Sequence, residues 1–177
     1  MIIGIALSKR FADKYGKRDV FKSALFISTL FIIAFYFFAP QSVVLIFVSQ
    51  ILHGFFYGLT IPVLWAMIAD VADFSEWKTN RRATAIIFSA MMVGLKAGLS
   101  VGSALLTWIL GSYGYITKEA AVNMGSIVQP ESAIHGTKML VSIYPAIPFL
   151  LCVVLLFFYE INKKMEVKIE NDLNERR

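Results

Sequence analysis

The chain has 177 residues, of which 58% are hydrophobic and 16% charged, and its formal net charge is +5. Its mean hydropathy of +0.68 is well above that of soluble domains, which indicates an integral membrane protein. The basic residues gather beside apolar segments, which favours membrane lipid over nucleic acid as a partner. The single cysteine, Cys152, excludes an internal disulfide framework.

Residues 1–19 begin with a short apolar run, 1–8, that is followed by the basic stretch KRFADKYGKR. A secretory signal peptide has the reverse order, with its charges before its apolar part. The apolar run forms only about two helical turns, which is too short to cross a bilayer. We therefore interpret residues 1–19 as the end of a truncated helix and a cytoplasmic basic loop, in which Gly16 permits the turn.

Four later segments are apolar over the roughly 20 residues that a helix needs to cross the hydrocarbon. A tight turn at Pro40 joins the first two, and a long loop precedes the last. A charged tail, 161–177, follows them and predicts a short amphipathic helix or a frayed end. The expected fold is an all-α membrane bundle over residues 20–160, with four full crossings at about 20–39, 42–69, 83–111 and 139–159.

Positive charge predicts how these crossings are oriented. Most of the 17 basic residues flank the start of the first crossing, the connection between the second and third, or the end of the fourth. The opposite ends carry only Lys118 and Lys138. Because basic residues are retained on the cytoplasmic side, we expect a multi-pass protein of the inner or plasma membrane with a cytoplasmic C-terminus.

One lysine, Lys96, lies near the middle of the third crossing, about 14 residues or roughly 20 Å from its basic end. A charge at that depth costs at least about 2.5–3.5 kcal/mol, so it normally faces a bundle interior or an aqueous cavity. Helical spacing groups this lysine with hydroxyl side chains and puts three glycines on the opposite face, where another helix could approach closely. The hydroxyl residues are Ser89, Ser100, Ser103 and Thr107, and the glycines are Gly94, Gly98 and Gly102.

A buried ammonium group needs a carboxylate or carbonyl partner, but the sequence has no acidic residue at the depth of Lys96. We therefore expect this partner on protein that the sequence does not contain. The alternatives for Lys96 are a residue of a substrate, ion or proton path and a lysine paired for folding alone.

The second crossing also carries polar groups on one face. His53 and Tyr57 share an arc of this helix, and Pro62 predicts a kink because proline removes a backbone hydrogen bond. His53 fits an interhelical hydrogen bond as well as a substrate contact. Trp65 fits ordinary packing as well as stacking on the apolar face of a sugar.

Charged residues concentrate at the cytoplasmic end of the second crossing. They are candidates for salt bridges that close an inner gate, and the alternative is that they only anchor helix ends at the interface. Asp13, in the preceding basic stretch, can cap a helix or pair in the same region. The other gate candidates are Asp70, Asp73, Glu76, Arg81 and Arg82.

The run AMIADVADFSEWKTNRRATAIIFSA, together with GLKAGLSVGSALLTWILGSYGY, resembles the glycoside-pentoside-hexuronide:cation symporters of the major facilitator superfamily. The resemblance covers nearly the whole chain and corresponds to the C-terminal part of a twelve-helix carrier. It implies that the four crossings are helices nine to twelve, and that the cation-site carboxylates lie on N-terminal helices outside this chain. Lys96 matches the family's helix-eleven lysine, beside the sugar and cation sites.

The resemblance therefore implies a fragment of a transporter that couples a sugar or glycoside to Na+ or H+ and needs the missing N-terminal half. Its site wall would contain Lys96, Ser100, Ser103, His53, Tyr57 and Trp65. A non-transporting membrane accessory or assembly subunit remains an alternative, as does a related carrier for a lipid or other solute. The sequence has neither a nucleophile and base pattern nor metal-spaced His or Cys residues, so we expect no enzyme and no cofactor.

Overall fold

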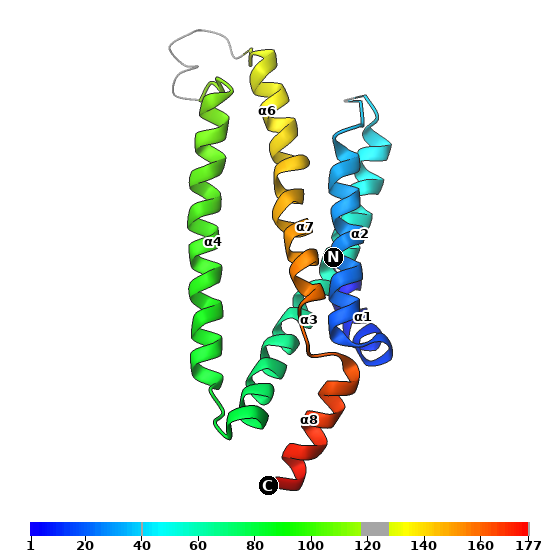
Figure 1. Cartoon of the computed structure of the whole chain (residues 1–177). Coiled ribbons are helices and arrows are strands. Elements are labelled where there is room, and N and C mark those ends of the chain that lie inside the picture. The colour runs from blue at the N-terminus through cyan, green and yellow to red at the C-terminus, as the bar shows by residue number, and fades with distance from the viewer. Residues whose placement is uncertain (40, 118–127, 177) are drawn as a thin grey trace.

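The computed structural model describes residues 1–39, 41–117 and 128–176, and every secondary-structure element in them is helical. Figure 1 shows long helices that run roughly side by side, with the C-terminal helix projecting beyond one end of the bundle. Two sequence predictions, the turn at Pro40 and the position of Lys118, lie outside the described residues.

The first two helices, α1 (Ile2–Tyr15) and α2 (Lys17–Phe35), meet at a single turn residue. Gly16 forms this turn with φ of +90°, a backbone conformation that other residues rarely adopt. The prediction of a basic loop before the first crossing is therefore wrong, because the stretch up to Tyr15 has no helix breaker and continues α1. Asp13 lies in the last turns of α1 and does not cap a helix start.

The third helix, α3 (Val43–Thr79), packs against α1 through very small residues. A Cβ atom added to Gly4 would overlap the carbonyl oxygen of Phe55, and one added to Gly58 would overlap the carbonyl oxygen of Met1. Ser8, four residues after Gly4, is also buried in α1. Small residues at this spacing let two helix backbones approach closely, as they do in membrane bundles.

The helix α3 continues ten residues past the predicted end of the second crossing at Ala69. The added segment, DVADFSEWKT, is polar but lacks glycine and proline, so nothing in it ends the helix. The helix ends at Asn80, which adopts a left-handed conformation with φ of 54°. Pro62 lies inside the helix, and the kink expected there stays a prediction.

The fourth helix, α4 (Thr84–Ser112), agrees with the predicted crossing at 83–111 to within one residue. It has no buried residue anywhere along its length. Its ring contacts with the rest of the bundle lie near its two ends, where Phe88 stacks on Trp65 of α3 and Tyr113 lies over Gly136 of the next helix. Figure 1 shows α4 standing apart from the other long helices over most of its length.

The last apolar segment forms two helices, α6 (Glu131–Val141) and α7 (Ile143–Phe157), that are interrupted at Ser142. The predicted start at 139 is therefore too late, because Pro130 and Glu131 already begin a helix. The interruption was not predicted. It follows from Pro145, which has no N–H to offer the carbonyl group of Val141 and so weakens the helix there.

Three helical segments of the described chain are long and apolar enough to cross a membrane: Val43–Thr79, Thr84–Ser112 and Glu131–Phe157. The helix at the first predicted crossing, α2, begins with the charged sequence KRDVFK, which lowers its mean hydropathy. The first predicted crossing, 20–39, and with it the count of four crossings, therefore stays a prediction.

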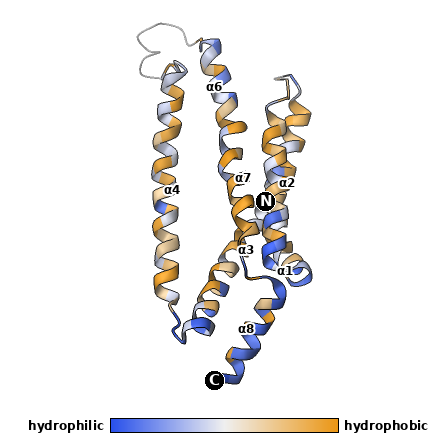
Figure 2. Cartoon of the chain, viewed as in Figure 1, coloured by the Kyte–Doolittle hydropathy of each residue, from blue (hydrophilic) through white to orange (hydrophobic). Residues whose placement is uncertain are grey.

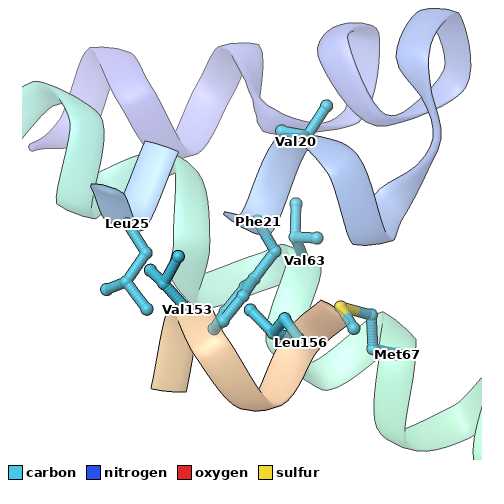
Figure 3. Packing of buried hydrophobic residues seen from close by; sticks show 7 residues of the cluster. All are labelled: Val20, Phe21, Leu25, Val63, Met67, Val153 and Leu156. Carbon is cyan, nitrogen blue, oxygen red and sulfur yellow. The ribbon is translucent and has the colours of Figure 1, made fainter. Parts of the chain in front are cut away.

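The hydrophobic core joins α2, α3 and α7 at the level of the lower half of α2 in Figure 1. In Figure 3, the Phe21 ring lies among aliphatic side chains from all three helices. Close packing of these side chains adds dispersion contacts between the three helices. The buried cluster consists of Val20, Phe21, Leu25, Val63, Met67, Val153 and Leu156.

The charged tail forms a helix, α8 (Lys163–Arg176), so the prediction of a short amphipathic helix is confirmed. It buries Ile169 and Leu173, which are 3% and 6% exposed. Figure 2 shows hydrophilic residues concentrated on α8, at the α3–α4 connection and around the α1–α2 turn, all toward the same end of the bundle.

Candidate functional site

Lys96 lies midway along α4 and is exposed. No described side chain forms a hydrogen bond or salt bridge with its ammonium group, and no acidic residue of the described chain lies on α4. The ammonium group therefore stands unpaired on a helix whose sequence is long and apolar enough to cross a membrane.

Two of the hydroxyl groups that share the Lys96 face donate hydrogen bonds within α4. Ser103 Oγ donates a hydrogen bond to the carbonyl oxygen of Leu99, and Thr107 Oγ1 donates to that of Ser103 at 3.0 Å. Ser100 is exposed, and its carbonyl oxygen accepts a second, longer bond of 3.3 Å from Ser103. These hydroxyl oxygens keep free lone pairs and can accept a hydrogen bond from a ligand.

The glycine face of α4, formed by Gly94, Gly98 and Gly102, is equally open. A Cβ atom added to any of the three would meet no other atom within 4 Å. The close helix approach predicted for this face is therefore not made by any described part of this chain.

His53 and Tyr57 lie on the side of α3 that faces α2 and α7. His53 Nδ1 lies 2.8 Å from Ser28 Oγ of α2, and its ring stacks on Tyr57 with centroids 5.7 Å apart. Tyr57 in turn stacks on Phe149 of α7 at 6.0 Å. His53 thus makes the interhelical hydrogen bond that was one of its two interpretations.

Trp65 lies on a different side of α3, where its ring stacks on Phe88 of α4 with centroids 6.3 Å apart. It is still 39% exposed, so part of the ring remains available to a ligand. No described contact joins Lys96 to His53, Tyr57 or Trp65. The residues predicted for one site wall are therefore on two helices and are not brought together within this chain.

The charged residues at the opposite end of α3 form a connected set with α2 and α8. Lys17 Nζ lies 2.6 Å from Asp70 Oδ1 and 2.8 Å from Glu166 Oε1. The side chains of Lys17 and Asp70 are only 24% and 14% exposed. One ammonium group therefore links the start of α2, the end of α3 and the start of α8.

Arg82 extends this set from the α3–α4 connection. It pairs with Asp73 at 3.0 Å and with Glu76 at 3.7 Å. We call the combined set the inner ion network; its members are Lys17, Asp70, Asp73, Glu76, Arg82 and Glu166. Four of the six predicted gate residues thus belong to it.

The other two predicted gate residues make their described contacts through the backbone. The carbonyl oxygen of Asp13 accepts a hydrogen bond from Lys163 Nζ, and that of Arg81 accepts one from Ser75 Oγ at 3.4 Å. A gate role for the side chains of Asp13 and Arg81 stays a prediction.

The electrostatics of Lys17 follow from its surroundings. Burial alone would lower the pKa of this lysine, but hydrogen bonds and charge attraction from Asp70 and Glu166 outweigh it and raise the pKa above its ordinary value. Lys17 is therefore firmly protonated at physiological pH and can hold two carboxylates at once.

Further contacts fix α8 to the C-terminal end of α3. Trp77 Nε1 donates a hydrogen bond of 2.8 Å to Asp172 Oδ2, and Arg176 Nη1 donates to the carbonyl oxygen of Trp77 at 3.2 Å and to Asn80 Oδ1 at 3.1 Å. A polar cleft of about 410 Å³ remains between α8 and the inner ion network. No group of three or more His, Cys, Asp or Glu side chains in the described residues is arranged to hold a metal ion.

Lys17 and Glu166 were missed as partners of Asp70 by sequence reasoning. Both carry charge, but they lie in segments distant from Asp70; Lys17 precedes it by 53 positions in the sequence. Only the alternation of apolar Ile169 and Leu173 with charges in the tail hinted that α8 packs against the bundle.

A long apolar helix with an unpaired lysine, beside other membrane-length helices, defines the chain as a multi-pass membrane protein. It belongs to the MFS/sugar transport protein family, whose model matches residues 1–163. The resemblance predicted from the acidic and basic string around Asp70 to Arg82 is thereby confirmed.

Similar proteins are known in bacteria. The chain is 32% identical over 154 residues to the inner membrane symporter YicJ of Escherichia coli (strain K12). These residues make up 87% of this chain and 32% of the relative. It is 26% identical over 176 residues to the putative glycoside/cation symporter YagG of the same strain. These residues make up 99% of this chain and 37% of the relative.

A third relative is an uncharacterized 29.9 kDa protein in the crtE 3' region of Pseudescherichia vulneris. It is 30% identical over 148 residues, which cover 84% of this chain and 50% of the relative. The chain thus spans between a third and a half of the length of these relatives.

Proposed function

We propose that this chain forms one part of a secondary active transporter that moves a sugar or glycoside together with Na+ or H+. Further helices, corresponding to the N-terminal half of such a carrier, would complete the site, and the two halves would rock around it to give alternating access. The carrier would lie in the inner membrane with the C-terminus of this chain in the cytoplasm. Family membership and relatives named as symporters support this proposal.

The observation that carries the proposal is the unpaired Lys96 on the apolar helix α4. An ammonium group at membrane depth is costly unless it meets an acidic or polar partner, so its retention argues for a functional partner. In the assembled carrier, Lys96 would pair with a carboxylate of the completing helices, and Ser100 and Ser103 would offer oxygen atoms to a ligand. His53, Tyr57 and Trp65 on α3 would form the neighbouring wall.

The test is Lys96→Ala in the assembled carrier, meaning this chain together with the helices that complete it, in proteoliposomes. We expect cation-stimulated glycoside uptake to fall roughly tenfold or more, because one hydrogen bond to a charged group contributes about 1.5–3 kcal/mol. Lys78→Ala, at the inner end of α3, is the matched control and should retain uptake. Unchanged glycoside binding and unchanged cation stimulation in Lys96→Ala would make Lys96 a structural residue only.

A non-transporting accessory subunit is the second candidate, favoured by the open glycine face of α4, which suits docking of a partner helix. The same assay separates the two functions. If the completing helices transport equally well without this chain, the accessory function holds. If this chain alone catalyses cation-dependent uptake, the need for completing helices is refuted. Uptake of a lipid or another solute in place of glycosides would change the cargo and keep the mechanism.

We further propose that the inner ion network closes the cytoplasmic side of the carrier. Its pairs join helix ends that would separate when the inner side opens. Asp73→Arg and Arg82→Asp should each alter uptake, and the combined swap should recover it because the pair is restored. If the swap recovers nothing beyond the single variants, the pair does not act as a gate.

A further inference from the structure

An apolar groove lies where α1, α2 and α3 meet, beside the basic turn between α1 and α2. Its volume is about 370 Å³, and its walls are mainly aromatic and aliphatic. Two of its rings, Phe11 and Tyr15, stack with centroids 6.4 Å apart and remain 37% and 54% exposed. The groove is thus an open apolar surface on the outside of the helix bundle.

The groove extends from charged helix ends into the apolar part of the bundle. Asp19 and Ile27 line it from the same helix, α2, and their spacing corresponds to about 12 Å along the helix axis. Phe55 and Phe56 of α3 line its wall across from α2. A ligand that fits this profile has a polar end at the level of Asp19 and an apolar end near Ile27.

Two basic side chains directly precede the groove residues Phe11 and Tyr15 in the sequence. Arg10 and Lys14 of α1 are exposed, and no described residue forms an ion pair with either. Lys14 Nζ lies 5.1 Å from the centroid of the Tyr15 ring, which forms part of the groove wall. Asp19, the acidic side chain that lines the groove, already pairs with Arg18 at 3.2 Å and with Lys22 at 3.4 Å. An anion at this end would therefore meet Lys14 beside the groove wall, with Arg10 one helical turn away on α1.

We propose that this groove holds an anionic phospholipid from the membrane leaflet next to the basic clusters. One acyl chain would lie along Phe11, Phe55 and Ile27, and the phosphate would lie between Arg10 and Lys14. Basic pockets between membrane helices on the cytoplasmic side suit such headgroups, and each basic side chain near the surface contributes about 1 kcal/mol. A zwitterionic lipid would fill the apolar part without this electrostatic gain.

Native mass spectrometry of the full chain, released from detergent after exchange with defined lipids, tests the proposal. The probes are phosphatidylglycerol and phosphatidylcholine with identical palmitoyl and oleoyl chains. We expect more retained phosphatidylglycerol than phosphatidylcholine. Arg10→Gln and Lys14→Gln should each lower that ratio about fivefold, the factor that about 1 kcal/mol corresponds to. Lys164→Gln, an exposed substitution on α8, is the charge-matched control and should leave the ratio unchanged.

A second variant, Ser23→Trp, tests the location, because Ser23 lines the groove and is exposed. The indole ring should fill the groove and reduce retention of both lipids. Circular dichroism should show unchanged helix content. If the indole ring disturbs folding, Ser23→Phe serves the same purpose with a smaller ring. Equal retention of the two lipids by the wild-type chain would overturn the proposal, as would unaltered binding in both Ser23 variants. Dimers that vanish in these variants would overturn it in favour of a second copy of the chain.

Discussion

At the scale of single residues, Lys17 joins three segments that are far apart in the sequence. Its ammonium group contacts Asp70 of α3 and Glu166 of α8 from the first position of α2. Without Lys17, two carboxylates would remain close together and lose their shared counter-charge, which is more costly than losing an exposed ion pair. The lysine therefore stabilises both the bundle end and the attachment of α8.

Replacing Lys17 by Gln should lower the free energy of unfolding by about 1–2 kcal/mol, between the values for exposed and buried ion pairs. The folded-state pKa of Lys17 is raised, so its contribution is complete below the ordinary lysine pKa of about 10.4 and is lost as pH rises through the folded-state value. Thermal unfolding in detergent should show a constant difference in stability between wild type and Lys17→Gln from about pH 7 to 10. Above pH 10 this difference in stability should shrink. The control is Lys164→Gln; a difference that grows above pH 10 would contradict the assignment.

Single residues differ in how far their roles could be predicted from sequence. Lys96 and the carboxylates at Asp70 and Asp73 stood out because charge is rare inside or beside apolar segments. The partners of Asp70 did not, because ion pairing depends on distances between segments that the sequence does not encode locally. His53 illustrates the same limit, since the sequence fitted an interhelical hydrogen bond and a substrate contact equally, and only the position of Ser28 reveals the hydrogen bond.

At the scale of helices, the crossing of α1 and α3 depends on residues without side chains. Gly4 and Gly58 bring the backbones so close that a methyl group at either position would overlap a carbonyl oxygen. Close approach of this kind increases dispersion contacts between helices in a lipid environment, where the hydrophobic effect contributes little to helix association. The crossing gives α1 a fixed position despite its short length.

Gly4→Val should therefore weaken the attachment of α1 to α3 and destabilise the chain by about 1–3 kcal/mol, the usual range for overpacking. Thermal unfolding in detergent measures the effect. Gly94→Val, on α4, is the matched control, because no atom lies within 4 Å of the added Cβ atom and only the modest helix-propensity change remains. Equal stability of the two variants would mean that the α1–α3 contact does not contribute to the fold.

Helix boundaries were predictable where the apolar pattern ended together with a structural signal. The bounds of α4 agree because polar residues and Gly114 flank a long apolar run in which Lys96 is the one charged residue. Continuation of α3 to Thr79 was missed, since a polar helix beyond the hydrocarbon has no hydropathy signature. The break at Ser142 was missed because its cause, Pro145, lies inside an otherwise apolar segment.

At the scale of the whole molecule, the bundle has one well-packed side and one open side. The helices α2, α3 and α7 share a common core and α1 packs against α2 and α3, whereas α4 contributes no buried residue (Figure 1). A membrane-length helix that buries nothing gains little from the rest of its own chain. Both the Lys96 face and the glycine face of α4 are thus free to contact the completing helices of the proposed carrier.

Gly98→Leu tests this division of contacts, because its effect should depend on whether the completing helices are present. In the chain alone, the leucine would enter open space, so the stability measured by thermal unfolding in detergent should be unchanged or slightly higher. In the assembled carrier, the leucine would hold a docking helix away from the α4 backbone, and both co-purification of the two parts and cation-stimulated uptake should fall.

Ile86→Phe is the matched control, because it adds volume to α4 at an exposed position outside both the glycine face and the lysine stripe. It should leave assembly and uptake intact. If Gly98→Leu assembles and transports like the control, the glycine face of α4 faces lipid in the carrier. The completing helices would then have to reach Lys96 from the side of Ser100 and Ser103 alone.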